Sequence, residues 1–177
     1  MLLAILLGLM MVWPSGGSYR ALTNTQLRWS ASFVVGASLQ FAVMPLVPSR
    51  VSSALPVVAW LVGGVLLILG CVANRRVRGF LVAASGVGLN ALVIGANGGM
   101  PVYSGALVAA GAGTEYSIEL GTIYRLADES TKLLLLADVV PVPGPPPIRS
   151  VGSLGDLLLC VGVIVVLLHL ASQPGSE

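Results

Sequence analysis

Long apolar stretches with hardly a charge inside them constrain this chain more than any other feature. Asp, Glu, Lys and Arg make up only 9% of its 177 residues, and the mean hydropathy is +0.95. A soluble domain of this size has too little interior to bury so much apolar surface. In lipid, each continuous apolar stretch satisfies its backbone hydrogen bonds within itself by forming an α-helix. The sequence therefore predicts an all-α integral membrane protein.

Breaks in the apolar pattern divide the chain into about five transmembrane helices, which we expect to form a single membrane domain over residues 1–177. The expected bounds are 1–17, 30–47, 55–73, 80–97 and 154–171. The first stretch is barely long enough to cross a bilayer, because a helix rises about 1.5 Å per residue. A cleaved signal peptide is the alternative there. We disfavour it because the stretch has neither a positive amino-terminal region nor a clear cleavage site.

The arginines indicate how these helices are oriented. If the helices alternate in direction, most arginines share one side of the membrane: Arg20, Arg28, Arg75, Arg76 and Arg78. The short connector on the opposite side has Arg50 alone. Cytoplasmic loops carry the excess of Lys and Arg. We therefore expect a multi-pass plasma-membrane protein with its amino terminus outside, residues 98–153 outside and its carboxyl terminus in the cytoplasm.

The outer segment 98–153 is too patterned to be a simple linker. Residues 133–142 form an apolar run interrupted only by Asp138, and this run is too short to span a bilayer. We interpret it as a helix that lies on or dips into the outer leaflet, with Asp128 or Ser130 capping its start. The prolines that follow predict extended, polyproline-like chain. The segment is thus expected to form a partly helical, extracytoplasmic lid between the fourth and fifth helices.

Three short stretches resemble a known family: residues 97–102 (NGGMPV), 133–142 (LLLLADVVPV) and 150–156 (SVGSLGD). They make the chain similar to the bacterial membrane family catalogued as DUF5317, a domain of unknown function. The resemblance implies a small polytopic bacterial membrane protein, and it supplies no activity, substrate or catalytic residue. The glycine-rich stretch 111–121, which contains glutamate, departs from the family pattern.

One face of the fourth span carries two amides. Gly86, Asn90 and Asn97 recur at helical spacing and therefore share this face. Such amides could line a polar path or bind a lipid headgroup. More often, an Asn in a membrane helix bonds a neighbouring helix, contributing about 1 kcal/mol, while glycine lets two backbones approach. We favour this structural role, and we expect the same of Gln40 in the second span.

Asp156, at the start of the fifth span, has two interpretations. An intramembrane carboxylate is a candidate functional group. However, Ser153 and Asp156 have the spacing of a capping box, in which each side chain bonds the backbone amide of the other residue. The helix dipole also favours a negative charge at this end. We favour the cap.

Asp138 is the more interesting carboxylate, because it interrupts an apolar run near the expected outer interface. A candidate ligand-binding cleft would be bounded by five polar residues: Asn90, Asn97, Asp138, Arg149 and Asp156. The alternative is a salt bridge between Asp138 and Arg149 that fastens the lid to the helices. We favour the salt bridge.

Three classes of function are compatible with these residues. Scarce reactive groups and many small residues favour a non-catalytic subunit or assembly factor that binds a partner membrane protein or a second copy of itself. A binder or carrier of a lipid, quinone or small solute beneath the lid is the alternative, and an intramembrane enzyme acting on a lipid-linked substrate is the third class. We expect no catalytic residue, no cofactor and no metal site, since His169 is the only histidine. The net charge of +2 argues against a nucleic-acid partner.

Overall fold

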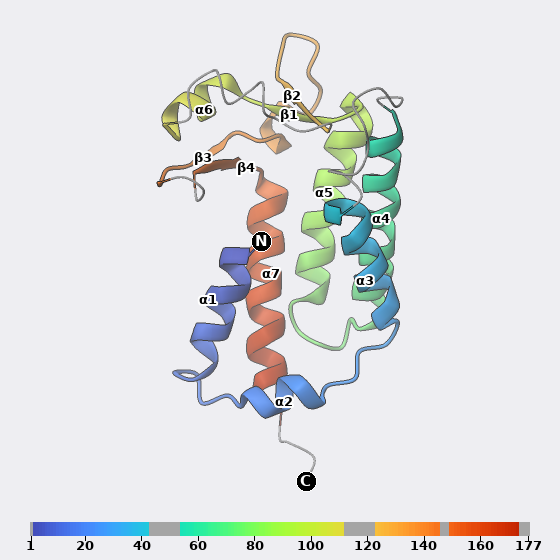
Figure 1. Ribbon diagram of the computed structural model, residues 1–177, viewed down its shortest axis with the longest axis vertical. Coiled ribbons are helices and arrows are strands. Elements are labelled where there is room, and N and C mark those ends of the chain that lie inside the picture. Colours follow the sequence, from blue (N-terminus) through green and yellow to red (C-terminus); the bar gives the residue numbers. More distant parts are fainter. Residues whose placement is uncertain (1, 43–53, 112–122, 146–148, 174–177) are drawn as a thin grey trace.

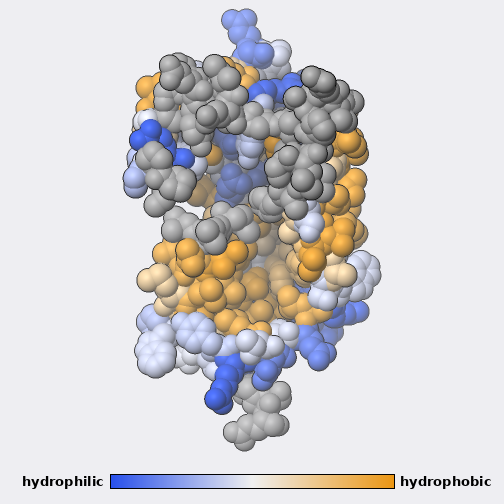
Figure 2. All heavy atoms as spheres, viewed as in Figure 1, coloured by the Kyte–Doolittle hydropathy of each residue, from blue (hydrophilic) through white to orange (hydrophobic). Residues whose placement is uncertain are grey.

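Three long helices form the frame of the molecule (Figure 1), a computed structural model that describes residues 2–42, 54–111, 123–145 and 149–173. They are α4 (Ala54–Ala73), α5 (Phe80–Asn97) and α7 (Leu154–Ala171). All three are long and apolar enough to cross a membrane. Their bounds agree with the third, fourth and fifth predicted spans to within one residue. On the face shown in Figure 2, an apolar belt crosses the middle of the molecule, and hydrophilic residues lie near its lower end.

Two shorter helical segments accompany this frame. α1 (Leu2–Val12) lies against α7, while α3 (Ser30–Ala37) lies against α4 and continues into a π-helical turn, η1 (Ser38–Ala42). Each is shorter than the roughly 20 residues that a membrane-spanning helix needs. The predicted end of the second span, residues 43–47, lies outside the described residues. Within the described part of the chain, three helices have spanning length, whereas the sequence predicted about five.

The helices alternate in direction, so their connectors gather at two ends of the molecule (Figure 1). A short helix, α2 (Tyr19–Asn24), lies in the lower connector and contacts the end of α7. The Asn74 side chain joins this connector to the one between α4 and α5. Its Oδ1 accepts from Arg28 N at 2.9 Å, and its Nδ2 donates to Arg28 O at 2.7 Å. The two arginine-bearing connectors therefore lie side by side.

The described parts of the connecting segment, residues 98–153, lie at the opposite end and contain short strands. β1 (Met100–Val102) pairs in parallel with β2 (Tyr124–Leu126), and β3 (Val140–Val142) pairs antiparallel with β4 (Ser150–Gly152). One short helix, α6 (Ser104–Ala109), follows β1. The all-α prediction therefore applies to the long helices and is wrong for this segment.

The helix predicted over residues 133–142 is also wrong. Only Leu134–Leu136 is helical, as a single 3-10 turn (η4) that contacts the ends of α5 and α7. Beyond this turn the chain is extended, and Asp138 N donates to Pro101 O at 3.0 Å. Pro141 has no N–H with which to continue a helix. Backbone pairing with a distant strand therefore overrides the local apolar pattern.

Two other local expectations for this segment are corrected by the structure. Asp128 Oδ1 accepts from Ser130 N at 2.9 Å, so it closes a turn and caps no helix. The chain at Val140–Val142 is extended, as predicted, but it is hydrogen-bonded in a strand pair and is not a free polyproline chain. Residues 146–148, within the proline-rich stretch, lie outside the described residues. Most of the stretch 111–121, where we expected a departure from the family pattern, lies outside the described residues.

Small residues make α5 and α7 a closely packed pair. A Cβ atom added at Gly86 would clash with the backbone of Gly155, and one added at Gly162 would clash with Ala83. Such close approach of two backbones is the packing expected of membrane helices. The predicted inward orientation of the Gly86 face is therefore confirmed.

The connecting segment is held onto the upper end of α5 by an apolar cluster. Val93 and Ile94 are almost fully buried, and they pack with Met100, Ile123 and Ala137 from the segment. Burying this many apolar side chains stabilises the closed arrangement, at about 25 cal/mol for each Å² removed from water. The helices and the segment thus share one core at this end.

Candidate functional site

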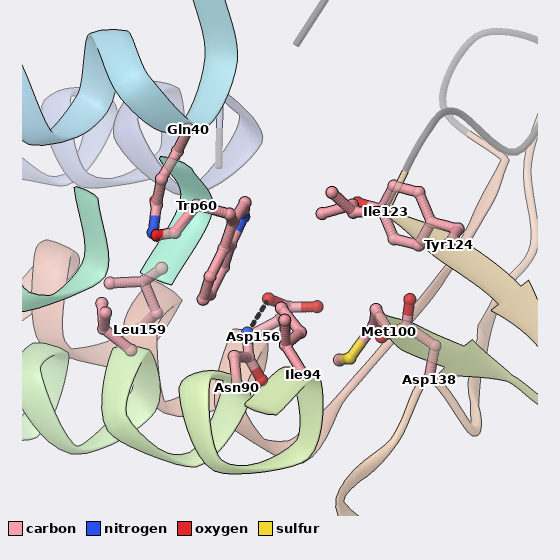
Figure 3. A pocket seen from close by; sticks show the side chains of 11 residues that line it. Gln40, Trp60, Asn90, Ile94, Met100, Ile123, Tyr124, Asp138, Asp156 and Leu159 are labelled. Carbon is pink, nitrogen blue, oxygen red and sulfur yellow. Dashed lines mark hydrogen bonds between the residues drawn. The ribbon is translucent and has the colours of Figure 1, made fainter. Parts of the chain in front are cut away.

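A cavity of about 230 Å³ lies between the upper ends of the helices and the connecting segment (Figure 3). η1, α4, α5 and α7 contribute to its lining, and so does the connecting segment. Most of the lining side chains are apolar or aromatic: Trp60, Val87, Ile94, Met100, Ile123, Tyr124 and Leu159. Four are polar: Gln40, Asn90, Asp138 and Asp156. In Figure 2, hydrophilic atoms are visible in a hollow of the upper half, above the apolar belt.

Asn90, Ser153 and Asp156 form a hydrogen-bonded network between α5 and α7. Asn90 Nδ2 donates to Asp156 Oδ1 at 2.8 Å, and Ser153 Oγ donates to Asn90 Oδ1 at 2.7 Å. Ser153 Oγ also accepts from Asp156 N, while Asp156 Oδ2 accepts from Ser153 N at 3.1 Å. The predicted capping box is therefore confirmed, and so is the predicted bond from Asn90 to a neighbouring helix. The same network fixes the Asp156 carboxylate in the cavity wall.

Asp138 reaches the cavity from the connecting segment. Its backbone is fixed by the bond to Pro101 O and by a bond from Tyr103 N to Asp138 O at 3.0 Å. The residue is only 4% exposed, and its Oδ1 has no hydrogen-bonding partner among the described residues. Burial, and to a smaller extent the negative charge of Asp156, raises the pKa of Asp138 to about 8. A carboxyl group with this pKa is mostly protonated at neutral pH.

Arg149, which the sequence placed at the same cleft, does not line the cavity. Its guanidinium donates to the backbone oxygens of Gly111 and Gly144. The predicted salt bridge between Asp138 and Arg149 is therefore wrong. Two backbone carbonyl groups of the connecting segment accept hydrogen bonds from the guanidinium. Asp138 instead lies beside β1, to which its backbone is bonded, and its side chain faces the cavity.

Asn97 also lies outside the cavity lining, although it shares a face of α5 with Asn90. Its Nδ2 donates to Val93 O in its own helix and to Lys132 O at 3.0 Å. Its Oδ1 accepts from Lys132 N at 2.8 Å. Asn97 therefore fastens the connecting segment to the end of α5. Of the five residues predicted for the cleft, the cavity brings together Asn90, Asp138 and Asp156.

Gln40 and Trp60 line the cavity from the other side. Gln40 is 7% exposed, and its Nε2 donates to Trp60 O at 3.4 Å, which is the interhelical bond predicted for it. Its additional place in the cavity lining was not predicted. One sign of it is the π-helical turn around Gln40, because such turns are frequent at functional sites. Tyr124 reaches the lining through the pairing of β1 with β2, for which the sequence carries no local signal.

The polar lining defines what the cavity can do chemically. It offers two carboxyl groups and two amides, and none of the described lining residues is basic. The nearby Arg125 is engaged elsewhere, since its Nη2 donates to Gly98 O at 2.7 Å. Among the described residues there is no group of three or more His, Cys, Asp or Glu that could hold a metal ion. The cavity is therefore suited to accept hydrogen bonds from a small molecule.

Comparisons with known proteins place the chain in a recognised group. Residues 24–168 match the family of unknown function DUF5317. An uncharacterised protein from Thermotoga maritima is 33% identical over 102 residues, which is 57% of this chain and 57% of that relative. The match thus spans little more than half the length of the relative. No solved structure matches the chain.

Proposed function

Because the chain belongs to the DUF5317 family, whose function is unknown, we propose a function from the site itself. The protein binds a small ligand in the cavity beneath the connecting segment, which acts as a lid. The observation that carries this proposal is Asp138 Oδ1, a buried acceptor without a partner in the part of the chain that the structure describes. Native proteins rarely leave such an atom unsatisfied, and each exception calls for an explanation. A donor on a bound ligand would satisfy it.

The size and lining of the cavity restrict the ligand. Drug-sized ligands occupy pockets of about 300–1,000 Å³, and this cavity, at about 230 Å³, is smaller. It suits a small solute, or the polar head of an amphiphile, better than a whole lipid or quinone. Its walls combine apolar surface with a few convergent polar groups, which is the usual composition of a small-molecule site. The ligand therefore has an apolar part and at least one hydrogen-bond donor.

We further propose that the protein crosses the inner membrane several times, with the lid outside and the carboxyl terminus in the cytoplasm. Five helical segments in alternating directions support this topology (Figure 1). The orientation is supported by the two arginine-bearing connectors, which Asn74 joins at the end opposite the lid. An excess of arginine in short loops is typical of the cytoplasmic side.

Native mass spectrometry of the purified protein tests the binding function. Leu159 lines the cavity, so Leu159→Trp would fill part of it. Leu157 is 48% exposed and is absent from the lining, so Leu157→Trp is a matched control in the same helix. We expect a small molecule to co-purify with the wild type and with Leu157→Trp but to be absent from Leu159→Trp. If a folded Leu159→Trp variant retains the molecule, the ligand does not bind in this cavity.

A second candidate function is supported by the outer face of α5. A Cβ atom added at Gly88 or Gly95 would meet nothing within 4 Å, and Ser85 on the same face is exposed. A small-residue face of this kind suits close contact with a helix of a partner membrane protein. On this proposal, the chain is a non-catalytic subunit of a membrane complex. Gly88→Leu would then remove a co-purifying protein, and retention of that protein would argue against the candidate.

A further inference from the structure

We propose that the ligand of the cavity is an organic cation: a protonated primary amine carried on a small apolar or aromatic body. This ligand class rests on the binding function proposed above and specifies its chemistry. The ammonium group donates to Oδ1 of Asp138 and to the carboxylate of Asp156. In Figure 3, the Asp156 carboxylate lies between the indole ring of Trp60 and the Asp138 side chain in this view.

The charge of the lining selects against anions. Among the described residues, the titratable groups that line the cavity are Asp138 from the connecting segment, Asp156 from α7 and Tyr124 from β2. The remaining polar side chains, Asn90 from α5 and Gln40 from η1, are neutral. A carboxylate or phosphate ligand would be repelled by the negative charge at Asp156. A cation satisfies both carboxyl groups.

The hydrogen-bonding capacity of the two carboxyl groups fits an ammonium group. Within the described residues, Asp138 Oδ1 has no partner, and each oxygen of Asp156 accepts one bond, from Asn90 Nδ2 and from Ser153 N. Each carboxylate oxygen can accept about two bonds, so both residues can accept more. An ammonium group on a primary amine has three donors that can be shared among them. Divalent metal ions fit less well, because Ca²⁺ takes about six to eight oxygen ligands.

The apolar lining explains why the cation is organic. Trp60 and Tyr124 offer aromatic surfaces, which attract ammonium groups placed within about 6 Å of the ring centre. Met100 and Leu159 line the cavity with the apolar surface that the body of the ligand would cover. A small inorganic cation would leave this surface in contact with water.

The protonation state of Asp138 predicts a further property of the binding. Its pKa is raised to about 8, so near neutral pH the group carries a proton that an ammonium ligand would displace. Binding of the cation then releases a proton, and the affinity increases as the pH rises towards the pKa of Asp138. A neutral ligand would show no such increase.

Calorimetry on the purified full-length protein tests the ligand class with three probes that share a phenyl ring. They are 2-phenylethylammonium, 2-phenylethanol and 3-phenylpropanoate, whose head groups are positive, neutral and negative. We expect the ammonium probe to bind at least about tenfold more tightly than the alcohol, corresponding to about 1.4 kcal/mol, and the carboxylate to bind most weakly. We also expect Asp138→Asn to weaken ammonium binding by at least about tenfold. Glu129→Gln, which changes an exposed carboxylate of the same segment, should leave binding unchanged.

The outcomes separate this inference from the binding function. If the alcohol binds as tightly as the ammonium probe, or if Asp138→Asn binds both probes equally well, the proposal of a cationic ligand is overturned. The cavity then remains a binding site. If none of the three probes binds, the proposal of a cationic ligand is overturned. The co-purification experiment with Leu159→Trp then decides the binding function separately. The comparison of probes on the wild type needs no variant, so it stands even if Asp138→Asn does not fold.

Discussion

Asn90→Leu tests the polar connection between α5 and α7. The substitution keeps the approximate size of the side chain and removes both of its interhelical hydrogen bonds, to Asp156 Oδ1 at 2.8 Å and from Ser153 Oγ at 2.7 Å. It also leaves the fully buried Ser153 hydroxyl without its acceptor. In addition, the Asn90 amide packs directly against Gly155, where a branched leucine has little room.

The expected cost follows from these contacts. Interhelical hydrogen bonds in membrane proteins contribute about 0.6 kcal/mol on average, with a maximum of about 1.7 kcal/mol. Two such bonds therefore account for about 1–3 kcal/mol, and the unsatisfied Ser153 hydroxyl places the expected value in the upper half of that range. We predict that Asn90→Leu lowers the free energy of unfolding by about 2 kcal/mol.

Equilibrium unfolding in mixed micelles measures this change. Ser85→Leu is the matched control, because Ser85 is exposed on the same helix and its hydroxyl bonds only Leu81 O of that helix, at 2.9 Å. We expect the control to change the free energy of unfolding by less than about 0.5 kcal/mol. A loss below about 0.5 kcal/mol for Asn90→Leu, or equal losses for both variants, would refute the reasoning.

Three further predictions concern pH, the lid and topology. The free energy of unfolding of the wild type relative to Asp138→Asn should fall as the pH rises from about 4 to about 8, because the folded state retains a proton that the unfolded chain has lost. Chemical denaturation at several pH values measures this difference, and a difference that does not change with pH would contradict the prediction. Asn97→Ala should speed proteolysis in the connecting segment by removing its bonds to Lys132; an unchanged digestion rate would argue against this tether. In intact cells of a cysteine-free background, a membrane-impermeant thiol reagent should label a cysteine at Gly144 and not one at Arg76, and the reverse pattern would invert the topology.

The helical frame was predictable because its determinants are local. Lipid leaves an apolar stretch no alternative to a helix, and polar or glycine residues mark the ends. Ser153 and Asp156, which lie three positions apart in one S-x-x-D motif, were sufficient to predict the start of α7 and its capping bonds. The spacing of Gly86 and Asn90 likewise predicted which face of α5 packs inward, since helical periodicity fixes that face.

The connecting segment was not predictable in the same way. Residues 133–142 look like a short amphiphilic helix, but the chain there pairs with β1, about 35 residues earlier in the sequence, and no local pattern encodes that pairing. Arg149 is held by two carbonyl groups whose positions depend on the folded loop. The position of Tyr124 in the cavity lining was equally unpredictable, because it depends on the pairing of β2 with β1. Asp138 was recognised as unusual, but its partner was assigned wrongly.

The titration of the Asp138 carboxyl group tests the central claim most directly. Carbon-13 NMR of aspartate-labelled protein, with the resonance assigned through Asp138→Asn, measures the midpoint with and without 2-phenylethylammonium. We predict a midpoint of about 8 in the free protein, and a lower midpoint in the presence of the probe, because the bound cation stabilises the carboxylate. A midpoint near the ordinary aspartate value of about 4 would show that the carboxyl group is not buried as the structure places it. A raised midpoint that the probe leaves unchanged would contradict cation binding at Asp138.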